Sequence, residues 1–453
     1  MDTPSFDEQE RYQQELAAFL SIPSVSMDPA RRGDMRAAAE WVAAQLGFAN
    51  GRVVDSDGHP VVVGEWLGAT GTPMILVYGH YDVQPAGDES EWTTPPFEPS
   101  IRDGHIYARG ATDDKGPVFV ALKVAEAFHA RDGALPLNVR FLFEGEEEIG
   151  SRSLPAFIAA HPDEVSADIV VSADGAMWRP SEPSIAIAAR GVLALDVTVT
   201  GPSSDLHSGR HGGAVPNPNH ALAAILASLH EPSGGVAVEG FYDGVEALGD
   251  ADRAALDAVS FDEEVYRREV GVSALHGEPG YSTLERLWAR PTLEVNGIEG
   301  GGSFTVIPRR SRAHVTCRLV PGQRPDAVFA AIAAHIRAHA PPGVEVEIEA
   351  EPGAVPAYSI AADHPVVVAG RRALALVYPD GEPLLVRMGG TLPAAVLFEQ
   401  ILGLKTLMFS FSTGDEQLHA PDEFFRLARL GEGMRAWAEL WLLLAERRGV
   451  DTT

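Results

Sequence analysis

Residues 74–82 read MILVYGHYD, an apolar run that ends directly in a histidine and an aspartate. Short runs of apolar, β-branched and aromatic residues predict buried strands. A helical segment at about 116–130 follows, and strands that alternate with helices predict an α/β domain with a mostly parallel sheet. Three further apolar runs lead into acidic or imidazole side chains in the same way: VRFLFEGEEE at 139–148, DIVVSAD at 168–174, and TLMFSFS at 406–412 before His419.

The middle of the chain has a different pattern. From about residue 188 it predicts strand, helix, strand, strand, helix, strand, an order typical of a two-layer, ferredoxin-like α+β unit. The strands are expected at 194–201, 292–300, 313–320 and 344–352, and the helices at 220–229 and 326–339. The interval 232–290 is polar and fits neither element type.

The predicted architecture is therefore one domain inserted into another. An α/β domain is expected from residues 1–190 and 356–453, with an inserted α+β domain at 191–355. The α/β domain should open with helices at 6–20 and 34–46. Ser5, with Glu8 three residues later, predicts a capping box at the first of them.

Composition makes several classes of partner improbable. The chain has 35 Lys and Arg against 64 Asp and Glu, a net charge of −29, and should repel nucleic acid and anionic membranes. The single cysteine, Cys317, allows no intrachain disulfide and fits a reducing compartment. The first residues lack the basic and apolar regions of a signal peptide, and no apolar run reaches about 18 residues. A cytoplasmic location is expected.

Five candidate metal ligands follow the predicted strands or lie in the loops between them. Ligands gather at the carboxyl ends of strands in open α/β sheets, so one site could collect them all. Two imidazoles and three carboxylates suit Zn²⁺, Mn²⁺ or Co²⁺. Because three carboxylates exceed what one catalytic zinc needs, a carboxylate shared between two cations is expected. The five residues are His80, Asp113, Glu148, Asp174 and His419.

Hydrolysis at such a site also needs a base. If Glu148 binds metal, the adjacent Glu147 can stand over the attacking water. Asp82, two residues past His80, can accept a hydrogen bond from that imidazole. Each motif alone is more often a solvated turn, a helix start or a charged face. The hypothesis of a metal site rests on all of them occurring together in this order.

Five motifs carry a resemblance to a known family: GHYDVQP, ARGATDDKGP, EGEEEIGS, SADG and LHAPDE. Over nearly the whole chain they resemble the M20 metallopeptidase family, and in particular its carnosinase-like dipeptidase branch. The resemblance implies that His80 and Asp174 hold one metal ion. It implies that Glu148 and His419 hold a second ion, and that Asp113 bridges the two.

The resemblance also implies roles for the neighbouring residues. Glu147 would be the general base, and Asp82 would orient His80. The peptide bond between Asp113 and Asp114 would be cis. Two divalent ions, Zn²⁺ or alternatively Mn²⁺, are the implied cofactors, and a short peptide is the implied substrate.

The resemblance implies a phosphorylase/hydrolase-like catalytic domain, and the inserted domain resembles the family's lid or dimerisation domain. Its segment SSDLHSGRHGG implies that His207, rather than His211, reaches the active site of a neighbouring subunit in a homodimer and stabilises the oxyanion. Arg318, in the segment CRLVP, would bind the substrate's terminal carboxylate. Further substrate contacts are implied for Thr305, Gly390 and Thr391.

Two alternatives to a dipeptidase are considered. An N-acyl amino acid deacylase or desuccinylase of the same family would use the same metals, and pocket walls that motifs encode poorly would decide between them. Asp rather than Glu at position 174, together with the lid features, favours a dipeptidase. A non-catalytic scaffold is disfavoured because every ligand and Glu147 are present.

Overall fold

The computed structural model describes residues 1–446, and the chain forms two compact units. The first consists of Met1–Ile187, Ile360–Val386 and the chain from Pro393 on. The second consists of Ala188–Ser359 together with the short stretch Arg387–Leu392.

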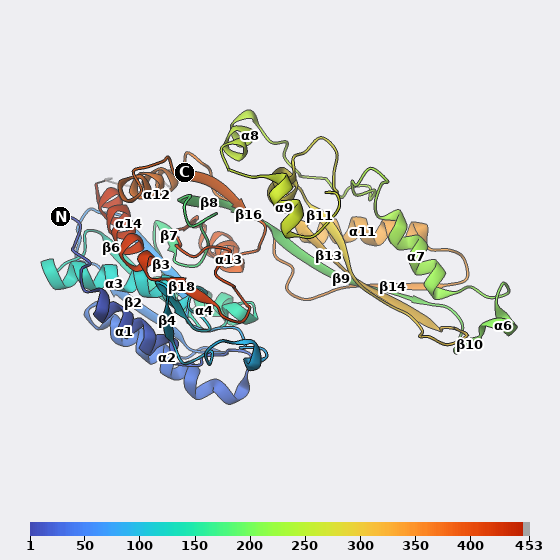
Figure 1. Ribbon diagram of the computed structural model, residues 1–453, viewed down its shortest axis with the longest axis horizontal. Helices are drawn as coiled ribbons and strands as arrows, with labels where there is room; N and C mark the ends of the chain where they lie inside the picture. Colours follow the sequence, from blue (N-terminus) through green and yellow to red (C-terminus); the bar gives the residue numbers. More distant parts are fainter. Residues whose placement is uncertain (447–453) are drawn as a thin grey trace. The chain divides into compact units, whose positions relative to one another are not determined.

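The first unit is built on a mixed sheet whose centre is parallel (Figure 1). β3 pairs in parallel with β6 on one side and with β7 on the other, and β17 continues the parallel pairing from β7. The outer strands β1, β2 and β8 run antiparallel to their neighbours. In spatial order the strands are β1 (Arg52–Val54), β2 (Val61–Trp66), β6 (Asn138–Glu144), β3 (Met74–His80), β7 (Ile169–Ser172), β17 (Thr406–Met408), β8 (Ser184–Ala189) and β15 (Tyr358–Ser359). A ninth strand, β16 (Leu384–Met388), pairs with β8.

Helices cover both faces of this sheet, as the near-continuous apolar character of the central strands requires. On one face Tyr78 of β3 packs edge-to-face on Phe398 of α13 (Pro393–Leu402), with ring centroids 5.1 Å apart. On the other face Gly79 lies under α3 (Lys115–Asp132), and a Cβ on Gly79 would come within 2.5 Å of Val118. The glycine lets α3 approach β3 closely, which places the loop before α3 next to the end of β3. This confirms the helix predicted at about 116–130.

The remaining helices of the first unit complete these two layers. α4 and α5 share the core on the α13 side, α1 and α14 pack on α3, and α12 packs on α14. Their bounds are α1 (Gln9–Leu20), α2 (Arg32–Gln45), α4 (Leu154–Ala160), α5 (Pro162–Val165), α12 (Pro365–Val377) and α14 (Ala428–Ala445).

Two local predictions are wrong. The first helix begins at Gln9 and has no side-chain cap, because the Ser5 hydroxyl donates to Asp7 instead of capping the helix. The capping box predicted from Ser5 and Glu8 is therefore absent. The last strand is also shorter than the apolar run 406–412, since β17 ends at Met408.

The second unit contains a four-stranded antiparallel sheet in the order β11, β13, β9, β14, as expected for a ferredoxin-like unit. Buried and partly exposed residues alternate along β9, and the buried set packs on α7 and α11. The elements are β9 (Gly191–Thr200), α7 (Pro218–Ser228), β11 (Thr292–Glu299), β13 (Arg310–Leu319), α11 (Pro325–His339) and β14 (Glu345–Ala350).

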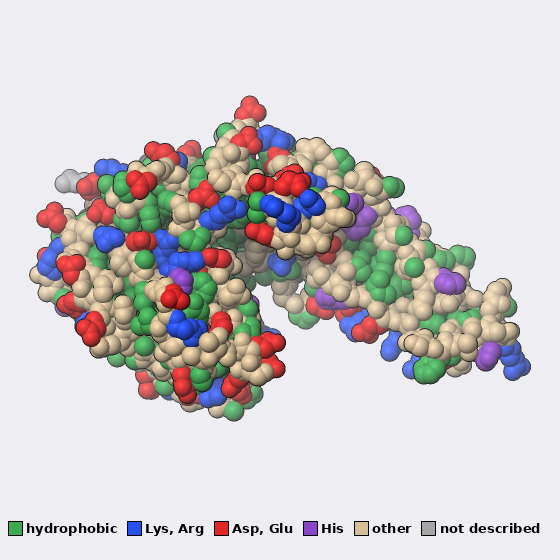
Figure 2. Space-filling model, viewed as in Figure 1, with side chains coloured by type: hydrophobic (Ala, Val, Ile, Leu, Met, Phe, Trp, Pro, Cys, Tyr) green, Lys and Arg blue, Asp and Glu red, His purple; other side chains and the backbone are tan. Residues whose placement is uncertain are grey.

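The interval 232–290, left unassigned above, contributes three short helices to the second unit. They are α8 (Asp250–Asp257), α9 (Glu263–Glu269) and α10 (Thr283–Ala289). Figure 2 shows Asp and Glu side chains scattered over the visible surface with Lys and Arg between them, so the negative charge forms no single patch in this view. Among the described helices, none is long and apolar enough to cross a membrane.

Candidate dinuclear metal site

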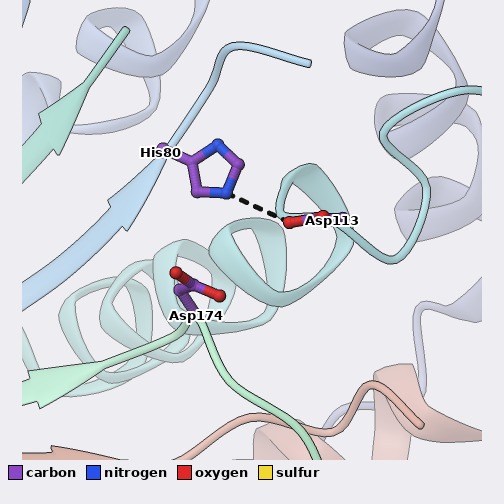
Figure 3. Close-up of side chains that lie close together, drawn as sticks. All are labelled: His80, Asp113 and Asp174. Atoms are coloured by element: carbon purple, nitrogen blue, oxygen red, sulfur yellow. Dashed lines mark hydrogen bonds and ion pairs between the residues drawn. The ribbon is translucent and has the colours of Figure 1, made fainter. Parts of the chain in front are cut away.

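The carboxyl ends of the three central parallel strands position most of the predicted ligands. His80 is the last residue of β3, and Asp174 follows β7 by two residues. The turn after β6 is the 3₁₀ helix η4 (Glu147–Ile149). Because parallel strands end at the same edge of a sheet, these groups converge there. Figure 3 shows His80, Asp113 and Asp174 lying together, with Asp113 contributed by the loop before α3.

Asp113 belongs to two groups of possible ligands. In the first group, ligand atoms of His80, Asp113 and Asp174 all lie within 4.8 Å of one another. In the second, the same holds for Asp113, Glu148 and His419. Asp113 Oδ1 lies 3.2 Å from His80 Nε2, and Asp113 Oδ2 lies 2.8 Å from His419 Nε2. Each carboxylate oxygen therefore faces one group, which is the arrangement a bridging ligand needs. The Asp113–Asp114 peptide bond is cis.

Asp82 connects one ligand to the predicted base. The aspartate is fully buried, and its Oδ1 lies 3.3 Å from His80 Nδ1. Its two carboxylate oxygens also accept the backbone N–H groups of Glu147 (3.2 Å) and Glu148 (3.1 Å). The sequence predicted the contact with His80 but not these two hydrogen bonds. One side chain thus fixes the imidazole and the turn that carries both glutamates.

A buried ion pair that the sequence did not single out supports Asp113. Glu423 accepts hydrogen bonds from the Arg109 guanidinium (2.7 Å) and from the backbone N–H groups of Gly110 (2.9 Å), Thr112 (2.9 Å) and Asp113 (3.2 Å). It therefore holds the loop that presents the shared carboxylate. Glu423 lies in the quoted motif LHAPDE, four residues after His419, and that spacing was the one available signal.

The site is rich in buried carboxylates. Burial raises the pKa of Glu147 well above its usual range, and nearby carboxylates add to the effect. Burial, then the charge of Asp113, raises the pKa of Glu148 to about 7. Burial also raises the pKa of Asp174 to about 6. At Asp113, burial is outweighed by hydrogen bonds from His419 and His80, which lower the pKa of that carboxyl below its usual range.

These residues fit a pair of divalent cations. Four carboxylates lie near only two imidazoles, so the charge of the ionised site is strongly negative and buried. Burying unpaired charge is costly, and cations would remove that cost by neutralising it. The donors are oxygen and imidazole nitrogen, the set that Zn²⁺ and Mn²⁺ accept.

Glu147 differs from its neighbours in one respect. In the described part of the chain, no protein donor hydrogen-bonds to its carboxylate, whereas Glu148 Oε2 accepts from Gln84 (2.8 Å) and lies 3.4 Å from His419 Nε2. The Glu147 carboxylate is thus free to exchange a proton with a bound molecule.

The predicted residues of the second unit fall into two separate places. His207 of β10 (Leu206–His207) pairs with Val306 of β12 (Val306–Ile307), and the Thr305 carbonyl accepts the next backbone N–H, so His207 and Thr305 are neighbours. At the second place, Arg318 Nη1 donates to Thr391 Oγ1 over 3.1 Å, beside Gly390.

The chain is similar to known metallopeptidases. Residues 76–443 match the model of peptidase family M20/M25/M40. The chain is 30% identical to the Cys-Gly metallodipeptidase dug1 of Schizosaccharomyces pombe, covering 93% of this chain and 92% of that protein. It is also 30% identical to the human Beta-Ala-His dipeptidase, covering 96% and 86%.

Solved structures show the same fold. The crystal structure of human carnosine dipeptidase 1 aligns with a TM-score of 0.79 at 29% identity, covering 97% of both chains. The metallo-carboxypeptidase Sso-CP2 of Sulfolobus solfataricus aligns with a TM-score of 0.84 at 30% identity, covering 98% of this chain and 100% of that one.

Proposed function

The chain belongs to peptidase family M20/M25/M40, and from this premise we propose that it is a dinuclear metal-dependent dipeptidase. The observation that carries the proposal is Asp113, whose two oxygens face two ligand groups beside Glu147. The alternative, an N-acyl amino acid deacylase, is not favoured, because the two curated relatives described above are dipeptidases.

We assign the cofactors as two divalent ions, Zn²⁺ in the first place and Mn²⁺ as the alternative. His80 and Asp174 would hold one ion. Glu148 and His419 would hold the other, with Asp113 shared between them. When bound, the two ions supply Lewis-acid polarisation of the scissile carbonyl and of a water molecule.

The protein's own residues supply the proton transfers and the binding contacts. Glu147 takes the proton of the attacking water and passes it to the leaving amine, a role that its place in the turn beside Glu148 and its lack of protein donors favour. Asp82 accepts the backbone N–H of Glu147 and lies beside the His80 imidazole, so it holds the base and this ligand in fixed relative positions. Arg318, steadied by Thr391, binds the terminal carboxylate of the dipeptide.

The geometry of the second unit supports action of His207 in trans. The β10–β12 pair that carries His207 adjoins the start of β13 at Arg310, and Arg318 lies eight residues along that strand. At about 3.4 Å per residue, the two ends are roughly 27 Å apart. A dipeptide spans only about 7 Å. His207 of the same chain would therefore not reach a dipeptide held by Arg318, so we propose a homodimer in which the second copy supplies the histidine.

The proposed partners and location follow from composition. A small peptide is the substrate, and the net charge of −29 argues against nucleic acid. Cys317, the only cysteine, is buried in the core of the second unit. A cytoplasmic location remains a prediction that rests on this cysteine usage.

A substrate panel tests the proposed reaction. We expect the Zn²⁺- or Mn²⁺-loaded protein to hydrolyse dipeptides with a kcat/KM at least about tenfold above that for N-acetyl and N-succinyl amino acids, as a dipeptidase rather than a deacylase should. Amine release would be measured for both classes at equal metal loading. Faster turnover of the acylated compounds would replace the dipeptidase with a deacylase.

Mixed dimers test the role of His207. The variants His207→Ala and Glu147→Ala should each be nearly inactive alone. After subunit exchange, random pairing makes half of the dimers hybrids, each with one complete site, so activity should recover to about a quarter of wild type. Sedimentation would check the assembly. A fully active monomer, or no recovery in hybrids verified as mixed, would contradict the trans assignment.

A further inference from the structure

The second unit contains a cavity of about 630 Å³ beside the start of its edge strand β11. This is within the usual range for a small-molecule site. The cavity is lined by residues of β11 and β13, by α10 and by the loops on either side of it. Two arginines, Arg190 and Arg318, form part of the wall.

The pairing of β9 with β13 brings Arg190 and Arg318 close together. Arg318 of β13 is paired with Val192 of β9, and Arg190 directly precedes the first residue of β9, Gly191, which is paired with Leu319. The charge of Arg318 accordingly acts on Arg190, and both side chains line the cavity. Both also contact the same short loop. Arg190 Nε donates to the Gly389 carbonyl and Arg318 Nη1 donates to Thr391 Oγ1, each over 3.1 Å.

Neither arginine has an acidic partner. Within the described chain, no carboxylate lies within ion-pair distance of Arg190 or Arg318. The contrast with Arg290 in the same cavity is clear, because Glu278 binds that guanidinium through both oxygens, over 2.7 and 2.8 Å. Glu294 also lines the cavity and its charge acts on Arg190, but among the described residues it is exposed and makes no ion pair with Arg190.

The pair of cations is unfavourable in the absence of a ligand. Burial, then the positive charge of Arg318, lowers the pKa of Arg190 to about 10, yet a guanidinium stays protonated at neutral pH. Like charges held close together without counter-charge oppose each other. Each guanidinium uses a single N–H group on the 389–391 loop, which leaves the other donors of both free to bind an anion in the forked geometry that suits a carboxylate.

We propose that Arg190 is a specificity-determining residue that binds a second carboxylate, so that the enzyme prefers dipeptides with a C-terminal aspartate or glutamate. This rests on the proposed function, in which Arg318 binds the terminal carboxylate. Arg190 then takes the side-chain carboxylate of the same residue. A dicarboxylate matches two uncompensated guanidinium groups in number and in charge, whereas a neutral C-terminal residue leaves Arg190 unpaired.

The test compares acidic dipeptides with their neutral isosteres. For the metal-loaded enzyme, kcat/KM for Gly-Glu should exceed that for Gly-Gln by about 10- to 100-fold, the range of a charge-assisted hydrogen bond. Arg190→Gln should lose most of this preference and Arg190→Lys should keep part of it. Arg286→Gln is the matched control. Arg286 also lines the cavity, but it bonds to Ser282 and Thr283 of its own helix end, and its loss should leave the preference intact.

Binding to an inactive enzyme separates this inference from the proposed reaction. In a Glu147→Gln background, Gly-Glu should bind at least about tenfold more tightly than Gly-Gln, and Arg190→Gln should remove the difference. Equal kcat/KM for the two dipeptides in the wild type, or an unchanged preference in Arg190→Gln, would overturn the assignment of Arg190. If no dipeptide at all is hydrolysed while the Arg190-dependent binding preference persists, the proposed function fails and the dicarboxylate site stands.

Discussion

Replacing Glu147 by alanine or glutamine is expected to lower dipeptide hydrolysis by about 10³-fold or more while the metal content stays unchanged. A positioned general base contributes about 10²–10⁴-fold, and loss of the base also removes the group that protonates the leaving amine. Glu147 is neither a member of the two ligand groups nor bonded to a protein donor in the described chain, so its loss should leave those groups in place. Metal content by elemental analysis and kcat by amine release would be measured on the same samples.

The adjacent glutamate supplies the contrast. Glu148→Gln should lose metal as well as activity, because Glu148, Asp113 and His419 form one of the two groups of candidate ligands. Glutamine keeps the size of both side chains, so the two variants differ only in which glutamate loses its charge. If Glu147→Gln keeps substantial activity, or loses metal as Glu148→Gln does, Glu147 is not the base.

The convergence of the candidate ligands could be predicted because a parallel sheet imposes where strand ends meet. The runs that lead to His80, to the Glu147–Glu148 turn and to Asp174 are β3, β6 and β7, and β3 pairs in parallel with each of the other two. Their convergence therefore required only the strand assignment. The failed capping box shows the opposite case. Ser5 had the right spacing from Glu8, but a competing acceptor two residues away, Asp7, took its hydroxyl.

Other features depend on contacts between distant segments, which local patterns do not encode. Arg190 and Arg318 are brought together by the pairing of β9 with β13 and by the 389–391 loop, which both contact. Glu423 belongs to the motif LHAPDE, but its hydrogen-bond partners lie more than 300 residues earlier in the chain, so the motif alone could not identify them. The sequence suggested which residues carry the chemistry. The residues that hold them in place could be identified only from the three-dimensional structure.

Replacing Glu423 by glutamine is expected to destabilise the protein by about 3–5 kcal/mol, as breaking one side of a buried ion pair does. Arg109 and Glu423 are 2% and 0% exposed, so the guanidinium left behind cannot be solvated. All four groups around the Glu423 carboxylate are donors. A carboxylate accepts from all of them, but the amide NH₂ of glutamine would face some of them donor to donor. Urea unfolding of the wild type and the variant measures the difference.

The same change should weaken metal binding, since three of the four donors belong to the loop that ends in Asp113. We expect Glu423→Gln to lose metal on dialysis against a chelator concentration that the wild type withstands, even at a temperature where the variant remains folded.

Glu382→Gln is the matched control. Glu382 is 91% exposed, and its carboxylate makes a long ion pair with Arg371, over 4.0 Å. An exposed pair contributes at most about 1 kcal/mol, so this variant should keep its stability and its metal. Equal behaviour of the two variants would mean that the Arg109–Glu423 pair does not hold the shared ligand in place. The metal readout is the more specific of the two, because a role limited to the core would lower stability without changing metal retention in the folded protein.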